Sequence, residues 1–191
     1  KLQEQRFQEL INAAPDAMVI VDETGDISLV NNQTERLFGY DRNELIGQKV
    51  EILVPEENRA NHPKLRDHYM RNAAVRSIGQ ALSLMAQAKD GTRIPVDISL
   101  SPIETADGML VVASVRDVTE RKKAEETIRQ QKEFVETVIN SMPDSIAVIE
   151  VDTGRIVDVN EASMREVGKP REGIVGQYCY EAYRNRAEPC T

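Results

Sequence analysis

The chain has 191 residues, a formal net charge of -8 and an isoelectric point near 5.0. Nucleic acids and anionic membrane surfaces bind basic faces, so this charge argues against both as main partners and leaves soluble partners or a small-molecule ligand. The sequence has no apolar run that could span a bilayer, so we expect no membrane contact by these residues. The spacing of Cys179 and Cys190 matches no metal motif, which predicts reduced thiols in the cytoplasm.

Two parts of the sequence are near copies of each other. The repeat is too long for a solenoid and has the spacing of whole domains in tandem. The second copy contains only the opening portion of the first, so we expect a truncated second domain. The matching segments are 10–16 with 138–144, 30–31 with 159–160, and 46–48 with 175–177.

The first copy opens with a helix and a hairpin. Apolar residues at helical spacing predict a short amphipathic helix over residues 1–14, which ends at Pro15. Residues 18–22 and 27–31 are β-rich runs around a turn, and this pattern predicts a hairpin. A helix with Gly39 as its C-cap is expected next.

The rest of the first copy alternates between short helices and strands. Asp41 is placed to cap a second short helix, and residues 55–72 form a polar, helix-leaning stretch. Three strand candidates follow, at residues 81–86, 94–100 and 109–115. Two strands, several short helices and three more strands predict an α+β domain with one antiparallel sheet and helices packed on one side.

Residues 119–142 are rich in Glu, Lys, Arg and Gln and contain no Gly or Pro. Their apolar residues alternate in steps of four and three, which is the a/d pattern of a coiled coil, so we predict a parallel homodimer through this helix. The alternative is a single helix that packs this face on its own domain. Gln131 would weaken the seam and could set its register. The seam consists of Ala124, Ile128, Gln131, Val135, Val138 and Met142.

Several short motifs follow one another along the first copy. They are Pro15-Asp16-Ala17, Asn31-Asn32, Leu37-Phe38-Gly39-Tyr40, Glu44-Leu45-Ile46-Gly47, Lys89-Asp90-Gly91 and Val115-Arg116-Asp117-Val118-Thr119-Glu120-Arg121. In this order they resemble a PAS domain followed by its signalling helix, and the second copy resembles the first half of another PAS domain. The resemblance implies a PAS fold: a five-stranded antiparallel sheet with short helices on one face, over residues 15–118, then a linker helix and a partial second domain over residues 143–191.

The resemblance also implies a function. PAS domains are sensory and interaction modules, commonly upstream of histidine kinases or nucleotide-cyclising domains. We therefore expect a non-catalytic sensor and dimerisation region of a two-component signalling protein, whose output domain, a kinase or diguanylate cyclase, lies outside this chain. Asp117 and Thr119 stand where the last strand meets the helix, so they are candidates both for capping that helix and for coupling it to the sheet.

A haem-binding gas or redox sensor is the alternative function. The segment around His62 is similar to the region of oxygen-sensing haem PAS proteins whose histidine binds the iron, and this similarity would make His62 the axial ligand. Gln80 and Leu82 would then lie on the distal side, where those proteins have an arginine or a methionine. His68 is six residues from His62, which puts the two on different helix faces, so no shared metal site is expected.

Other cofactors have less support in the sequence. The first copy has no cysteine for a light-sensing flavin adduct, and the chain has no tryptophan to stack on a redox FAD. An unoccupied or ligand-binding pocket is therefore our first interpretation, haem the second and FAD the third. Asn31 and Asn32 end a strand near the expected pocket mouth, where capping of the next helix is their simplest role.

Overall fold

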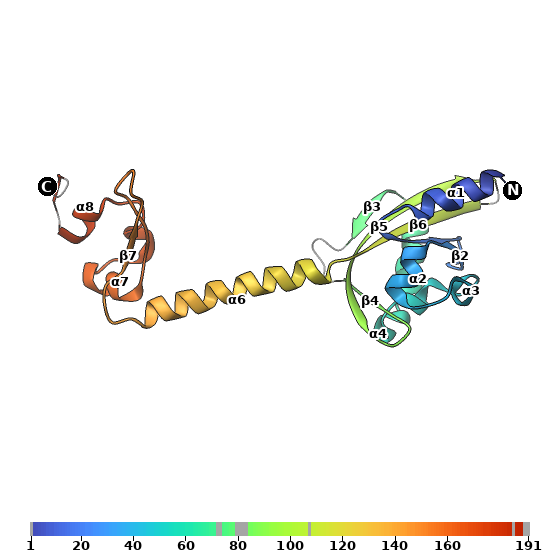
Figure 1. Cartoon of the computed structure of the whole chain (residues 1–191), viewed down its shortest axis with the longest axis horizontal. Helices are drawn as coiled ribbons and strands as arrows, with labels where there is room; N and C mark the ends of the chain where they lie inside the picture. The colour runs from blue at the N-terminus through green and yellow to red at the C-terminus, as the bar shows by residue number, and fades with distance from the viewer. Residues whose placement is uncertain (1, 72–73, 79–83, 107, 185, 189–191) are drawn as a thin grey trace. The chain divides into compact units, whose positions relative to one another are not determined.

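The computed structural model divides the chain into two compact units, Lys1–Lys123 and Ala124–Thr191. The first unit ends within the helix α6 (Thr119–Ser141), which continues without interruption into the second (Figure 1). None of the described helices is both long and apolar enough to cross a membrane. The residues that the structure describes are 2–71, 74–78, 84–106, 108–184 and 186–188.

The first unit is built on one antiparallel sheet. Its strands are β1 (Ala17–Val21), β2 (Ile27–Val30), β3 (Arg76–Ile78), β4 (Leu84–Gln87), β5 (Arg93–Thr105) and β6 (Gly108–Asp117). The order is β2-β1-β6-β5, and β3 and β4 both pair with β5. Because β3 pairs with residues 98–100 and β4 with residues 93–96, the two short strands follow each other along one edge. In its described part the sheet is thus five strands wide, as predicted.

The edge of the sheet departs from the sequence prediction. The strand expected at residues 81–86 is seen as β4 at Leu84–Gln87, and residues 81–83 lie outside the described part of the chain. Strand β3 was not predicted, since Arg76-Ser77-Ile78 is too short to show alternation. This strand forms because β5 is long enough to offer a second stretch of backbone for pairing.

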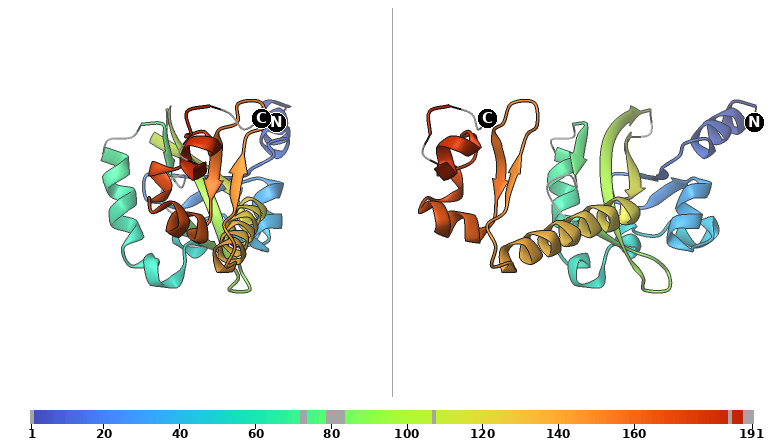
Figure 2. Two further views of the ribbon diagram at one scale, coloured as in Figure 1. Left: turned by 90° about the vertical axis from the view of Figure 1, so that its left-hand side faces the viewer. Right: turned by 60° about the vertical axis from the view of Figure 1, so that its left-hand side comes forward.

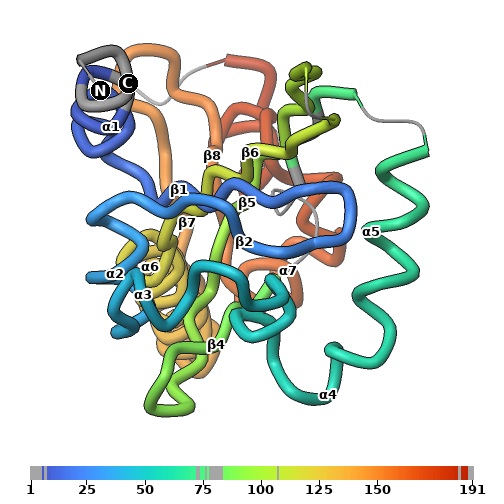
Figure 3. The backbone as a smooth tube through the Cα atoms, turned by 90° about the vertical axis from the view of Figure 1, so that its right-hand side faces the viewer, coloured from blue at the N-terminus to red at the C-terminus, as the bar shows by residue number. Residues whose placement is uncertain are grey.

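Short helices connect β2 to β3, and their ends carry the predicted caps. They are α2 (Asn32–Phe38), α3 (Arg42–Leu45), the 3₁₀ turn η1 (Val50–Leu53), α4 (Glu56–Arg59) and α5 (His62–Arg71), and α1 (Leu2–Asn12) precedes β1 (Figure 3). Gly39 ends α2 with φ of 72°, a left-handed conformation that glycine adopts without strain. Asp41 and Glu44 form a capping box at the start of α3.

The core lies between the sheet and helices α2 to α5. Alternate residues of β1, β5 and β6 point to the same side, because side chains alternate across a strand and the registers keep odd residues of β1 opposite odd residues of β6. Phe38, Leu45 and Leu53 close this layer from the helix side and are almost completely buried. Figure 1 shows α2, α3 and α4 on this one side of the sheet.

The second unit repeats the first half of this arrangement (Figure 2). Its hairpin has the same offset as the first: Val148 pairs with Asp158 but Ile149 with Ile156, and the first hairpin skips one residue at the same place. A small core forms around Ile156, Val159 and Ile174. The elements are β7 (Ala147–Ile149), β8 (Ile156–Val159), α7 (Glu161–Val167), the 3₁₀ turn η2 (Arg171–Gly173) and α8 (Cys179–Arg184).

Leu45 should be one of the strongest contributors to the stability of the first unit. Its side chain is 0% exposed, so Leu45→Ala removes buried methyl groups and leaves a cavity, and we expect a loss of about 2–5 kcal/mol. Urea unfolding followed through the amide signals of β1 and β6 measures this loss. Leu65→Ala is the control, since Leu65 is 67% exposed and its loss should cost less than about 0.5 kcal/mol. Equal costs for the two variants would refute this assignment of the core.

Candidate functional site

The junction between β6 and α6 is the first candidate site. The Asp117 Oδ1 atom accepts a hydrogen bond of 2.7 Å from the backbone N–H of Thr119, the first residue of α6. Between them, Val118 is only 4% exposed, and its N–H donates to the carbonyl of Pro95 in β5 at 3.0 Å. Asp117 and Thr119, the two candidates for coupling, therefore contact each other. The turn between them is hydrogen-bonded to β5 through Val118.

Two ion pairs brace this junction, and neither was predicted. Arg121, in the first turn of α6, contacts Asp97 of β5 with an Nη2–Oδ2 distance of 2.9 Å. Arg116, near the end of β6, contacts Asp16 through Nε at 3.0 Å and Nη2 at 2.9 Å. The partners are far apart in sequence, so only strand pairing could reveal them. The hydrogen bond from Arg116 holds the pKa of Asp16 below its ordinary value, although burial partly opposes the shift.

A cavity of about 340 Å³ lies beside this junction. It opens between the start of β1, the exposed side of α2 and the end of β6, so a bound molecule would touch the same segments that lead into α6. Charged groups of both signs and apolar groups face it. The lining residues are Pro15, Asp16, Ala17, Gln33, Arg36, Leu37, Val115, Arg116 and Asp117.

His62 stands elsewhere, at the start of α5. Its side chain is 33% exposed, and Nδ1 lies 2.9 Å from Oε1 of Glu51, a nearly buried residue of η1. Arg66, one turn later, donates to the same carboxylate oxygen at 2.7 Å. The Arg66 guanidinium also covers Gly25, whose φ of 83° is a left-handed conformation that glycine adopts without strain, and a Cβ there would displace the guanidinium. His68 is exposed on the same helix.

The two residues predicted on the distal side of the pocket, Gln80 and Leu82, lie outside the described residues, as does Cys190 of the second copy. Cys179 is a free, half-buried thiol that packs against the small core of the second unit. Within the described ranges, no group of three or more His, Cys, Asp or Glu side chains is arranged to hold a metal ion.

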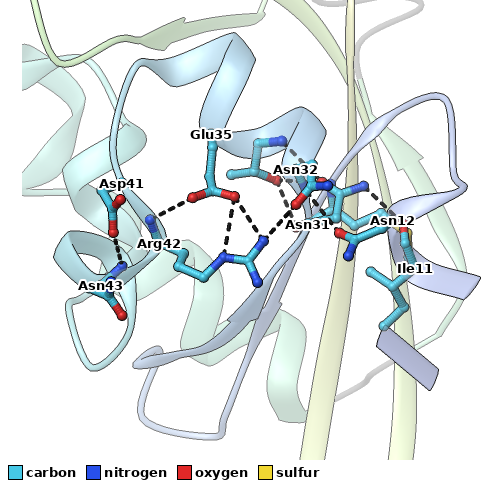
Figure 4. A network of polar contacts seen from close by, with 10 residues as sticks. Ile11, Asn12, Asn31, Asn32, Glu35, Asp41, Arg42 and Asn43 are labelled. Carbon is cyan, nitrogen blue, oxygen red and sulfur yellow. Dashed lines mark hydrogen bonds and ion pairs between the residues drawn. The ribbon is translucent and has the colours of Figure 1, made fainter. Parts of the chain in front are cut away.

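Asn31 forms a second polar centre, which the sequence indicated only as a cap (Figure 4). The side chain is 0% exposed, and its Oδ1 accepts from the N–H groups of Met18 at 2.9 Å and Thr34 at 3.0 Å. Its Nδ2 donates to the carbonyls of Ile11 at 3.1 Å and Asp16 at 3.0 Å. One amide thus joins α1, β1 and α2.

The predicted seam of α6 is open to solvent. Ile128 is 66% exposed, Val135 51%, Val138 36% and Met142 39%, and Gln131 is also exposed. Ion pairs such as Arg129 with Glu126 and Glu133 lie along the helix. Surface ion pairs of this kind add little stability, so the exposed apolar residues are the unexplained feature of this helix.

Comparison with known families gives two matches that together cover most of the chain. A family model described as the PAS fold matches residues 5–118. A second model, described as a PAS domain, matches residues 133–190. The two matched ranges correspond to the two copies recognised in the sequence.

Individual proteins are similar to this chain over the same region. Sensor protein FixL of Bradyrhizobium diazoefficiens is 30% identical over 136 residues, which cover 71% of this chain and 27% of FixL. Oxygen sensor protein DosP of Escherichia coli is 30% identical over 112 residues, covering 59% of this chain and 14% of DosP. The chain thus spans less than a third of either relative. The crystal structure of the PAS domain of an HTR-like protein from Haloarcula marismortui has the same fold, with a TM-score of 0.51 and 18% identity, covering 61% of this chain and 92% of that chain.

The Asp16–Arg116 pair should make the stability of the first unit depend on pH. Because the folded-state pKa of Asp16 is lowered, the pair stabilises the fold fully above the unfolded pKa, about 3.9 for Asp, and this stabilisation is lost as the pH falls through the folded pKa. Arg116→Gln should therefore destabilise the protein at neutral pH, and its deficit should shrink at acidic pH.

Carboxyl-carbon NMR titration of Asp16 tests the cause directly. The pKa of Asp16 should rise towards its ordinary value in Arg116→Gln and stay low in Arg36→Gln, a control in the same cavity that does not contribute to the shift. An unchanged titration of Asp16 in Arg116→Gln would contradict the assignment.

Proposed function

Because this chain belongs to the PAS family, we propose that it is the sensory and dimerisation module of a signalling protein. In this proposal, a change at the cavity or at an interface of the first PAS domain moves the β6–α6 junction. Helix α6 relays the movement towards an output domain outside these residues, a histidine kinase or a diguanylate cyclase. The chain itself senses and carries the signal and performs no catalysis.

The observation that carries the proposal is the exposed heptad seam on one continuous helix. Helix α6 runs from Thr119 to Ser141, and its seam residues Ile128, Val135 and Val138 stay 66%, 51% and 36% exposed although they repeat with coiled-coil spacing. A helix that packed this face on its own domain would have buried it. A second copy of the chain is the simplest partner. In parallel register, the seam side chains of one helix would pack between those of the other, in knobs-into-holes fashion.

The braced junction supports the relay part of the proposal. The first turn of α6 is tied to β5 by the Asp97–Arg121 pair, and the preceding turn is tied by Val118 and Asp117. A displacement of β5 or β6 would therefore reach the helix without first melting a flexible linker. A coiled coil with two arrangements of similar energy would supply the two-state element that such a relay requires.

Two aspartates in the seam should separate the dimer. Val135→Asp combined with Val138→Asp would bury like charges across the interface, so light scattering should give about half the mass of the wild-type dimer. The control places the same two charges off the seam, as Gln130→Asp with Thr137→Asp, and should remain a dimer. A seam variant that keeps the dimeric mass would refute the coiled coil.

Haem binding is a second candidate function, favoured by the position of His62 and by the similarity to a protein named as an oxygen sensor. The donor set suits an iron ligand, because an imidazole that gives its Nδ1–H to the Glu51 carboxylate keeps Nε2 free for the metal. Bound haem would supply reversible gas binding or a redox change at its iron. Glu51 would fix the tautomer of His62, and Arg66 would hold Glu51 in place.

Reconstitution with haemin tests this second function. His62→Ala should lose the Soret band, because a methyl group cannot bind iron, whereas His68→Ala should keep it. Glu51→Gln should retain the band but weaken haem affinity by about 10- to 100-fold, the usual effect of losing a carboxylate partner of a ligating histidine. If wild-type protein gains no more absorbance than His62→Ala, the haem function is refuted.

A further inference from the structure

The last turn of α6 occupies, in the second unit, the place that α1 occupies in the first. Asn160 Nδ2 donates to the carbonyl of Ile139 in α6 at 3.1 Å, as Asn31 Nδ2 does to Ile11 in α1. The neighbouring contact is repeated too, since Asn140 accepts from the N–H of Glu161 at 3.1 Å. Asn12 accepts from the N–H of Asn32 at the same distance. Helix α6 is therefore both the outgoing helix of the first PAS domain and the incoming helix of the second.

We propose that Asn160 is the positioning residue through which movement of α6 enters the second PAS domain, with Asn140 as its auxiliary. The inference deepens the relay described above and rests on it. Asn160 is then the point at which movement of α6 reaches the second PAS domain, whereas the relay proposal names only the helix. No ligand in the second unit is required.

The hydrogen bonds of Asn160 join three elements. Its side-chain Oδ1 accepts from Ile146, which precedes β7, at 3.0 Å and from Ser163 of α7 at 2.9 Å. The side-chain Nδ2 donates to Asp144 at 2.9 Å as well as to Ile139. The residue is 1% exposed, so water cannot replace a partner that its amide loses. A shift of α6 must therefore move β7 and α7 or leave a buried amide unpaired.

The apolar side chains at this end of α6 are only partly buried. Val138 and Met142 keep 36% and 39% of their surface exposed, and Ile139 is only half-buried. On the strand that the helix precedes, Val148 and Ile149 are 50% and 41% exposed. Asn160, which bonds to this end of the helix, is by contrast 1% exposed.

Aspartate at this position separates the two halves of the tie. Asn160→Asp keeps the acceptor for Ile146 and Ser163 but replaces the donor with an oxygen, which repels the carbonyls of Ile139 and Asp144. The cap of α7 should survive while the bond to α6 is lost. Asn31→Asp is the matched control, because it makes the same change at α1 and leaves α6 untouched.

Hydrogen exchange in the full chain is the first measurement. In Asn160→Asp, amides of the last turn of α6 should exchange about tenfold faster or more, because the tie no longer holds the helix end. In Asn31→Asp, faster exchange should be confined to α1. Unchanged exchange in the last turn of α6 of Asn160→Asp overturns the inference. If Asn160→Asp does not fold, Asn140→Ala with Asn12→Ala as its control gives the same comparison.

Transmission is tested by disturbing the junction from the sheet. Asp97→Lys places a positive charge against Arg121 and leaves the sequence of α6 unchanged. The amide chemical shifts of β7, β8 and α7 then report whether the second unit responds. The inference requires a response in the wild-type and Asn31→Asp backgrounds that falls at least severalfold in Asn160→Asp. A response that persists in Asn160→Asp overturns the role of Asn160 but leaves the relay intact. No response in the wild-type background overturns the relay and the inference together.

Discussion

A buried side-chain amide holds the incoming helix of each PAS domain against its first strand. Asn31 and Asn160 are almost completely buried, and each uses both ends of the amide to pair with two backbone carbonyls and two backbone N–H groups. Among side chains of this length only asparagine offers a donor and an acceptor in one planar group. One residue in each domain thus connects the incoming helix, the start of the hairpin and the helix that follows it.

Hydrogen bonds and an ion pair also hold each end of helix α6 against its own unit. At its start, α6 is held by the Asp117 cap and by Arg121 paired with Asp97. At its end it is held by Asn160. Along the helix, the residues of the heptad seam are exposed, and we propose that a second copy of the chain covers them. These contacts at the two ends are the basis of the relay that we propose.

The sequence predicted local structure well because the relevant signals are local. Glycine at a left-handed position, Asp41 with Glu44 three residues later, and alternating apolar residues each depend on near neighbours. Strand β3 was not predicted, because it forms by pairing with the far part of the long strand β5. The residues next to β3 give no signal of that pairing. His62 was recognised as a candidate ligand, but its pairing with Glu51 depends on how η1 and α5 pack.

By itself the sequence determined the repeat, the α+β class, the heptad on the linker and the caps, since each is written in residue spacing that helices and strands turn directly into faces. Only the tertiary structure decided which charges meet. Asp16 finds Arg116, and Asp97 finds Arg121, because strand register brings residues from distant parts of the chain within 3.0 Å. It also decided that Asn160 contacts α6, since that contact requires the hairpin, the turn and the helix to fold around one buried amide.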